Sequence, residues 1–259
     1  MPKFFVTTNQ INGDIITIEN EDVNHIKNVL RAKVNDQLEI CNCEKLENYI
    51  CKISKIEDKK ISCEIVEKKD SDTESNIKVS IFQGLPKADK MELIIQKSVE
   101  LGAFDITPVE MKRCVVKLKD KDRIKKIERW KKISEVAAKQ CGRDIIPNVN
   151  DLIDINGICK KIKEYDTVIV AYENEKDNTI KKELLELKEN KKENAGLSIA
   201  IVIGPEGGFE EKDVEILKQN GAKIVTLGKR ILRTETVALN VLSILMYELE
   251  QDAFRKESK

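Results

Sequence analysis

The chain of 259 residues is poor in several residue types, and each shortage excludes a class of protein. It contains one histidine, and its seven cysteines have irregular spacing without a C-x-x-C pair, so we expect no metal site and no disulfide framework. Basic and acidic residues number 46 each, and this balance excludes a globally basic nucleic-acid-binding protein. A local basic surface is still allowed.

Long apolar runs are also missing. The first residues, MPKFFVTTNQ, lack the apolar centre of a signal peptide, and no stretch reaches the roughly 20 apolar residues of a membrane span. We therefore expect a cytoplasmic protein without a membrane segment. Hydrophobic residues make up 41% of the chain, which is enough for a packed core, and the length allows one large domain or two smaller ones.

The N-terminal quarter shows the alternation of apolar and polar residues that is typical of half-buried strands. GDIITIEN, DQLEICN, YICKISKIE and KKISCEIVEKK all alternate, so we predict a small antiparallel barrel or sandwich. One helix is predicted over residues 20–33, where Val23, Ile26, Val29 and Leu30 have helical spacing.

A polar segment separates this region from the rest of the chain. Residues 68–76, KKDSDTESN, contain no apolar side chain and are rich in turn formers. We therefore expect a linker here between two domains, one over residues 1–70 and the other over residues 75–259.

Strands alternate with helices beyond the linker, which predicts a mostly parallel α/β sheet. The predicted strands are IKVSIFQ, DITPVEM, DTVIVAY, LSIAIVI and KIVTLG. The predicted helices cover residues 88–102, 123–140, 178–190, 210–220 and 234–251. Asp89 and Glu92 have the spacing of a capping box, and Gly102 is placed to end the first of these helices.

The stretch IVIGPEGGFE, residues 201–210, joins a buried strand to a glycine-rich bend. Its glycines allow a ligand to approach the backbone closely, although a tight turn without a ligand explains the bend equally well. The spacing differs from a dinucleotide fingerprint, and a P-loop would need Lys and Ser or Thr where Phe209 and Glu210 stand. Carboxylates repel phosphate, so we expect a ligand with ribose hydroxyls, an adenine edge or a positive centre.

A second late stretch, LGKRILRTETVALN, follows the last predicted strand. Thr234 and Thr236 are candidate N-caps of the final helix, which is apolar on nearly every side and so must be buried all round. In a domain of this size, such a helix is expected to pack against a second copy of the chain.

These two stretches together resemble the SPOUT class of RNA methyltransferases, and within it the family that methylates N3 of a uridine in small-subunit ribosomal RNA. FQGLPKADKMELIIQKSVELG, ITPVEMKRCVVK, RWKKISEVAAKQCGRDIIP and HIKNVLRAKVND support the resemblance, which covers nearly the whole chain. Cys114 departs from the serine that the family commonly carries there. The resemblance implies a C-terminal α/β domain with a trefoil knot, an N-terminal PUA-like β-barrel that binds RNA, S-adenosyl-L-methionine as cofactor and a homodimer through the last helix.

The resemblance also implies roles for individual residues. Arg233 is expected to stabilise the uracil anion, with Arg113 and Arg143 as further candidates. Glu235 is either the base that removes the N3 proton or a first-turn acid that favours the helix dipole. The cofactor is expected to contact Tyr172, Glu173, Gly204, Pro205, Glu206, Gly207, Gly208, Leu227, Gly228, Ile231, Leu232, Thr236 and Ala238. The RNA is expected to contact His25, Arg31, Lys87, Lys90, Arg113, Gln140 and Arg143.

The local charge supports RNA binding in one region only. Residues 112–132 carry eleven basic and three acidic side chains, which suits phosphate contacts as well as a solvated helix face. Residues 1–68 carry ten basic and twelve acidic side chains, so this domain would have to rely on shape and a few placed residues. A non-catalytic RNA-binding factor for ribosome assembly and a methyltransferase acting on another RNA remain alternatives.

Overall fold

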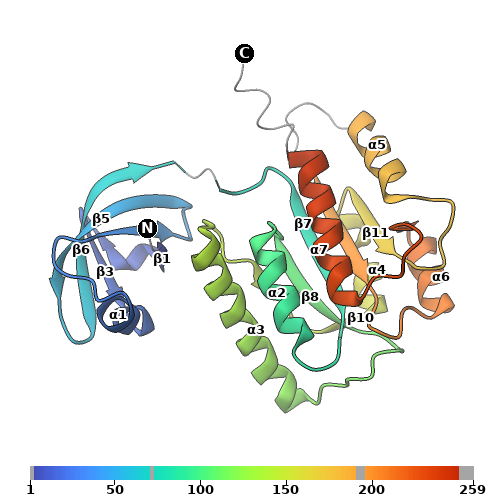
Figure 1. The fold of residues 1–259 in the computed structure, drawn as a ribbon, viewed down its shortest axis with the longest axis horizontal. Helices are drawn as coiled ribbons and strands as arrows, with labels where there is room; N and C mark the ends of the chain where they lie inside the picture. Colours follow the sequence, from blue (N-terminus) through green and yellow to red (C-terminus); the bar gives the residue numbers. More distant parts are fainter. Residues whose placement is uncertain (1–2, 71–72, 191–195, 251–259) are drawn as a thin grey trace. The chain divides into compact units, whose positions relative to one another are not determined.

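A computed structural model describes residues 3–70, 73–190 and 196–250, and it divides into two compact units (Figure 1). The first contains the chain up to Glu74 together with Ala138–Ile146, and the second contains Ser75–Ala137 and the chain from Pro147 onward. The boundary at residue 74 lies within the expected linker. The return of residues 138–146 to the first unit was not predicted.

The first unit is a six-stranded curled sheet with the strand order β1-β4-β5-β6-β3-β2. Its strands are β1 (Lys3–Val6), β2 (Ile11–Asn12), β3 (Ile15–Glu19), β4 (Gln37–Asn42), β5 (Glu47–Ile56) and β6 (Lys60–Lys69). All recorded pairs are antiparallel except β1 with β4. Two register shifts between β5 and β6 bend the long hairpin, and β1 and β2 stay at opposite ends of the strand order, so the sheet is a half-barrel.

The concave side of this sheet holds an apolar core that includes Phe4, Ile16, Ile40 and Ile53. All seven cysteines of the chain are free thiols. Burial raises the pKa of Cys41, Cys51 and Cys63 to about 12, so these side chains stay protonated and pack as small apolar groups.

The predicted helix of this unit is shorter and less regular than expected. It consists of α1 (Glu21–Asn24) and a π-helical turn, η2 (His25–Val29). Val23 and Ile26 are buried, but Val29 is 66% exposed, so the predicted four-residue apolar face was wrong at its C-terminal end. The π-turn adds a residue to the helical period and rotates Val29 away from the core.

The segment Ala138–Ile146 is held in the first unit by buried ion pairs. Lys3 pairs with Asp144, which is fully buried, and its Nζ lies 3.1 Å from Glu39 Oε1. Burial alone would lower the pKa of Lys3, but the hydrogen bonds and charges of Asp144 and Glu39 outweigh it and raise the pKa. Arg143 Nη2 lies 2.6 Å from Glu74 Oε2. The other carboxylate oxygen of Glu74, Oε1, accepts hydrogen bonds from the backbone N–H groups of residues 144 and 145.

The second unit contains a parallel sheet with helices on both faces, which confirms the predicted α/β class. Its strand order is β10-β8-β7-β12-β11-β13, with β9 on β8, and every recorded pair is parallel. The strands are β7 (Lys78–Gly84), β8 (Asp105–Glu110), β9 (Asn148–Val149), β10 (Ile153–Asp154), β11 (Thr167–Ala171), β12 (Ser198–Ile203) and β13 (Lys223–Val225). Ile199–Ile203 of β12 are at most 1% exposed, as expected for a central strand covered on both faces.

The helices follow the predicted order, with one addition. They are α2 (Lys90–Glu100), α3 (Asp120–Cys141), α4 (Ile155–Lys161), α5 (Ile180–Asn190), α6 (Glu211–Gln219) and α7 (Thr234–Leu245), which continues as the π-turn η4 (Met246–Glu250). The short α4 was not predicted. The predicted end of the last helix, Gln251, lies outside the described residues. In Figure 1, α2 and α7 run side by side across one face of the sheet.

Two predicted helix caps were wrong because their side chains bind other partners. Asp89 occupies the N-cap position of α2 without a side-chain hydrogen bond, and Glu92 instead accepts a hydrogen bond of 2.8 Å from Arg129 of α3. At α7 the N-cap residue is Arg233, and the Thr234 hydroxyl binds outside its own helix. Among the described residues, no helix is long and apolar enough to cross a membrane.

Removal of Asp144 is expected to destabilise the first unit strongly, because it takes the fully buried partner from the buried Lys3 ammonium and leaves it only Glu39 as an acidic partner. Asp144→Ala should cost about 3–5 kcal/mol, measured by hydrogen exchange of the β4 and β5 amides. Asp58→Ala serves as the control, because Asp58 is fully exposed in its pair with Lys27. Equal protection in the two variants would contradict a stabilising role of the buried pair.

Candidate functional site

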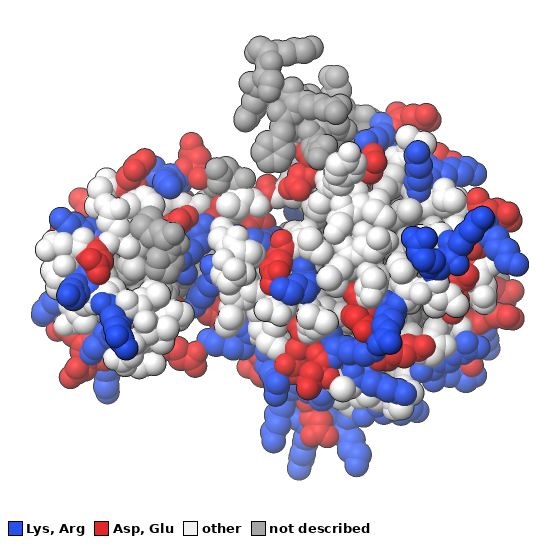
Figure 2. Space-filling view, viewed as in Figure 1, with Lys and Arg blue, Asp and Glu red and all other residues white. Residues whose placement is uncertain are grey.

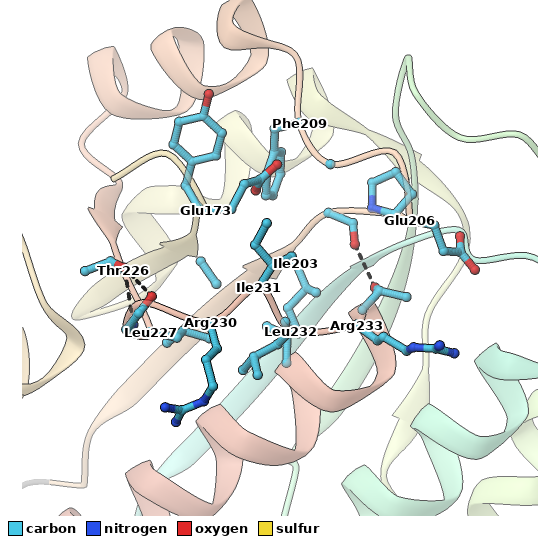
Figure 3. A pocket seen from close by; sticks show the side chains of 18 of the residues that line it. Glu173, Ile203, Glu206, Phe209, Thr226, Leu227, Arg230, Ile231, Leu232 and Arg233 are labelled. Atoms are coloured by element: carbon cyan, nitrogen blue, oxygen red, sulfur yellow. Dashed lines mark hydrogen bonds between the residues drawn. The ribbon is translucent and has the colours of Figure 1, made fainter. Parts of the chain in front are cut away.

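A pocket of about 420 Å³ lies at the carboxyl ends of three neighbouring strands, β11, β12 and β13 (Figure 3). Ala171, the last residue of β11, pairs with Ile203 of β12 and with Val225 of β13, so the three strands end at the same level. The three loops that leave them therefore face one another. Ligands bind at this edge in open parallel sheets.

The glycine loop after β12 forms one wall of the pocket. Gly208 has φ +67°, a conformation that favours glycine. A Cβ at this position would lie 2.4 Å from Glu173 Oε1, so a larger residue would move the Glu173 carboxylate from its present position in the pocket. The other two glycines serve packing within the chain. A Cβ at Gly204 would lie 3.1 Å from the Phe209 ring, and one at Gly207 would lie 3.0 Å from the Arg113 carbonyl oxygen.

The Thr234 hydroxyl fixes the floor of the pocket. Thr234 Oγ1 donates a hydrogen bond of 2.7 Å to the Gly204 carbonyl and accepts one of 2.8 Å from Gln83 Nε2 at the end of β7. Thr234 is 6% exposed and Gln83 is fully buried. The start of α7 is thereby attached to the ends of β7 and β12, and the hydrogen bond to Gly204 is drawn in Figure 3.

The loop after β13 forms the opposite wall. Gly228 N donates a hydrogen bond of 3.2 Å to Thr226 Oγ1, and φ of +116° at Gly228 turns the chain back. The loop then places Leu227 and Leu232 against the pocket, while Ile231 is 86% exposed. Apolar side chains and bare backbone groups are therefore the main surface offered to a ligand.

An ion cluster at the edge of the pocket joins the glycine loop to two helices. Lys90 Nζ lies 3.1 Å from Glu206 Oε1 and 3.2 Å from Glu235 Oε2. The hydrogen bonds to Glu206 and Glu235 raise the pKa of Lys90. Burial alone would raise the pKa of Glu206, but the backbone N–H groups of Glu206 and Lys87 and the Lys90 ammonium outweigh it and lower the pKa. Lys90 and Glu206 therefore stay charged near neutral pH.

The candidate catalytic residues differ in their positions. Arg233 lines the pocket and is exposed, and Figure 3 shows its side chain extending on the side where Glu206 lies, away from Arg230. Glu235 is outside the pocket lining and faces Lys90. Arg113 is also outside the lining, and its Nη1 donates a hydrogen bond of 3.2 Å to the Gly207 carbonyl.

Most of the predicted cofactor residues come together in this pocket. Those that line it are Tyr172, Glu173, Gly204, Pro205, Glu206, Gly208, Leu227, Gly228, Ile231 and Leu232. Gly207, Thr236 and Ala238 do not line it. Ala238 is fully buried inside α7, which explains why it cannot face a ligand.

The pocket also contains residues that the sequence did not single out. They are Ala171, Ile203, Phe209, Thr226, Lys229, Arg230, Thr234 and Val237. Lys90, which was predicted to contact RNA, lines the pocket as well. Phe209 stacks edge-on against Tyr172, with ring centroids 6.2 Å apart. The sequence signal that could have identified Phe209 as a lining residue is its position directly after Gly207 and Gly208.

The predicted RNA contacts are scattered and remain predictions, and the structure disfavours one of them. Arg143 is 7% exposed and paired with Glu74, so its guanidinium is occupied within the protein. His25 packs edge-on against Phe4 at 6.0 Å, and Arg31 and Gln140 are exposed on the first unit. Lys87 lies beside the ion cluster and donates its backbone N–H to Glu206 at 3.0 Å.

Among the described residues, no group of three or more His, Cys, Asp or Glu could hold a metal ion. The arrangement instead suits an organic ligand with an apolar part, hydroxyl groups and a positive charge, because apolar walls, backbone groups and the Glu173 carboxylate meet in one pocket.

Comparisons with known proteins agree with this description. An RNA methyltransferase domain matches residues 73–246, and an RNA methyltransferase PUA domain matches residues 18–66. Ribosomal RNA small subunit methyltransferase E of Bacillus subtilis is 39% identical over 254 residues, which cover 96% of this chain and 98% of that protein.

Two similar solved structures contain the predicted cofactor. Ribosomal RNA small subunit methyltransferase E from Neisseria gonorrhoeae, bound to S-adenosyl methionine, is 29% identical with a TM-score of 0.81, covering 95% of this chain and 97% of the other. A putative methyltransferase from Legionella pneumophila in complex with the same cofactor is 28% identical with a TM-score of 0.81, covering 95% and 96%. The predicted family is confirmed: the chain belongs to the RNA methyltransferase family that includes ribosomal RNA small subunit methyltransferase E.

Proposed function

We propose that the chain transfers the methyl group of S-adenosylmethionine to N3 of a uridine in small-subunit ribosomal RNA, in the cytoplasm where that RNA is found. The observation that carries this proposal is the pocket where three neighbouring strands end at the same level, which offers backbone groups, apolar walls and the Glu173 carboxylate to a ligand. S-adenosylmethionine supplies an electrophilic methyl group on a sulfonium centre.

The residues of the pocket fit this cofactor. Ile203, Leu227 and Leu232 provide apolar surface for the adenine and the methylene groups. The Glu173 carboxylate can accept hydrogen bonds from ribose hydroxyls or pair with a positive charge, and Gly208 leaves room for it. Lys90, the lining lysine beside the glycine loop, is paired with two carboxylates and so differs from the phosphate-binding lysine of a P-loop.

The chemistry at uridine requires removal of the N3 proton and stabilisation of the resulting anion. The proton leaves N3, the N3–CH₃ bond forms and the S–CH₃ bond breaks, which yields S-adenosylhomocysteine. Arg233 is placed at the pocket edge to stabilise charge on the uracil oxygens. Glu235, at the start of α7, is the candidate base, and its Oε2 lies 3.2 Å from Lys90 Nζ.

A non-catalytic assembly factor with the same fold is the alternative from another class. The glycine loop packs closely against Phe209, Glu173 and Arg113, and this packing favours the enzyme. A protein that no longer bound the cofactor would not need to retain glycine at these positions for the shape of the pocket. Calorimetry with S-adenosylmethionine separates the two: absence of binding at millimolar cofactor would support the assembly factor.

The expected homodimer through the last helix is also part of this proposal. Thr236, Ser243 and Tyr247 form an exposed stripe along α7 and η4, and Tyr247 is 65% exposed. Figure 2 shows that the surface over α7 carries few charged side chains. An uncharged helix face beside the cofactor pocket suits a contact with a second copy.

Substitution at Gly208 is expected to weaken cofactor binding. In Gly208→Ala, the new Cβ would displace the Glu173 carboxylate, and we expect the dissociation constant of S-adenosylmethionine to rise at least about tenfold in calorimetry. Gly13→Ala is the matched control, because Gly13 has φ +58° with open space around it and carries a similar backbone strain of about 1–2 kcal/mol. A normal dissociation constant in Gly208→Ala would place the cofactor elsewhere.

Arg233→Ala is expected to reduce methyl transfer far more than cofactor binding. Loss of one group that stabilises developing negative charge typically lowers kcat by about 10²–10³. Single-turnover transfer of a labelled methyl group to RNA and calorimetry of the cofactor measure the two effects. Lys182→Ala on α5, which is exposed and outside the pocket lining, is the control. Equal losses of transfer and binding in Arg233→Ala would assign Arg233 to the cofactor.

Ser243→Arg is expected to convert a dimer into a monomer, because it places a charge in the middle of the exposed stripe of α7. Light scattering coupled to size-exclusion chromatography should show the mass of two chains for the unmodified protein and of one chain for the variant. Lys181→Arg on α5 is the control. A mass of one chain for the unmodified protein would reject the dimer.

A further inference from the structure

A second cavity, of about 570 Å³, lies at the carboxyl ends of β8 and β10. Four cations, Lys112, Lys117, Arg123 and Lys160, line it together with two acids, Glu110 and Asp154. We propose that this basic cavity binds a backbone phosphate of the substrate RNA near the target uridine. The proposal rests on the proposed function, because it takes RNA to be the substrate.

The cations of the basic cavity are largely free to bind an external anion. Lys117, Arg123 and Lys160 have no ion pair recorded within the described part of the chain, and Arg123 is half-buried. Asp154 is occupied, because its Oδ1 accepts a hydrogen bond of 2.8 Å from Gly157 N as the N-cap of α4. Partial burial of an arginine without an acidic partner costs solvation, and an anion in the cavity would offset that cost.

The basic cavity and the cofactor pocket lie at the same edge of one sheet. In the sheet, β7 is next to β12, β8 is next to β7, and β10 is next to β8, so three strand spacings separate β12 from β10. With strands about 4.8 Å apart, the end of β10 lies roughly 14 Å along the edge from the end of β12. One RNA strand that places a uridine at the cofactor pocket can therefore extend its backbone along the strand ends to the basic cavity.

The loop after β8 connects the two sites physically. Lys112 lines the basic cavity, and its Nζ lies 3.0 Å from Glu210 Oε2 at the start of α6. The next residue, Arg113, donates a hydrogen bond to the Gly207 carbonyl of the glycine loop. The cavity is thus built against the wall of the cofactor pocket, and an RNA phosphate held there has a fixed distance to the transferred methyl group.

The chemistry of the lining favours phosphate over base recognition. Lysine and arginine side chains only donate hydrogen bonds, and phosphate oxygens only accept them. Such contacts position the nucleic acid without reading its sequence. The basic cavity is therefore expected to supply affinity and register, and not the choice of uridine.

The test combines Lys117→Gln, Arg123→Gln and Lys160→Gln in one protein. Its affinity for a fluorescent single-stranded RNA with the small-subunit sequence around a uridine is measured by anisotropy at several salt concentrations with saturating S-adenosylmethionine. Each phosphate that is no longer neutralised lowers the slope of log K against log salt by about 0.7, so loss of the one phosphate held in the basic cavity should make the slope smaller by about 0.7 and the affinity at least about tenfold weaker. The loss should be equal for an unrelated RNA sequence.

The control combines Lys181→Gln, Lys182→Gln and Lys218→Gln, which removes three exposed charges on α5 and α6 outside both cavities. Unchanged RNA affinity and salt slope in the cavity variant, or a loss equal to that of the control, would overturn the proposal. A loss confined to the cognate sequence would overturn it as well, since that indicates base recognition. The cofactor dissociation constant of the unmodified protein tests the proposed function separately, because it does not depend on the basic cavity.

Discussion

The Thr234 hydroxyl joins three chain segments that are far apart in the sequence. It donates to the Gly204 carbonyl after β12 and accepts from Gln83 at the end of β7, in surroundings that exclude water. A buried hydroxyl and a buried amide that lost these partners would each cost roughly 1–3 kcal/mol. The pocket walls on β12 and the start of α7 keep their relative position because of this contact, and Arg233 directly precedes it. The distance between the glycine loop and the candidate catalytic arginine therefore depends on this side chain, together with the Lys90 ion cluster.

The sequence could predict the fold class and the location of the site, because both follow from local patterns. Continuous apolar runs such as SIAIVI indicate central parallel strands, and glycine-rich or irregular stretches after them mark the strand ends. Parallel strands bring their carboxyl ends to one edge whatever the strand order is. Three loops could therefore be expected to meet although the order β7-β12-β11-β13 was unknown.

The wrong predictions concern side chains whose partners are distant in the sequence. Thr234 has the residue type and position of an N-cap, but a carbonyl thirty residues away is the better partner. Glu92 matches a capping box, yet it pairs with Arg129 of another helix. The expected RNA contact of Arg143 is a separate case, because this residue pairs with Glu74 in the first unit and its contact with RNA stays a prediction. Local propensity favours a cap by only about 1 kcal/mol, so a partner from a distant part of the chain can take its place.

The distribution of charge explains how a neutral chain can act on a polyanion. Glu173 and Glu206 line the candidate cofactor pocket, and Glu206 and Glu235 are paired with Lys90, which leaves the Glu173 carboxylate to face a positively charged ligand. Exposed cations surround the mouth, among them Lys229, Arg230 and Arg233, and Figure 2 shows Lys and Arg gathered around the start of α3. At physiological salt the Debye length is about 8 Å, so acidic surfaces elsewhere on the chain are screened from this edge. The local sign of charge at the strand ends, and not the net charge of zero, therefore determines where RNA is attracted.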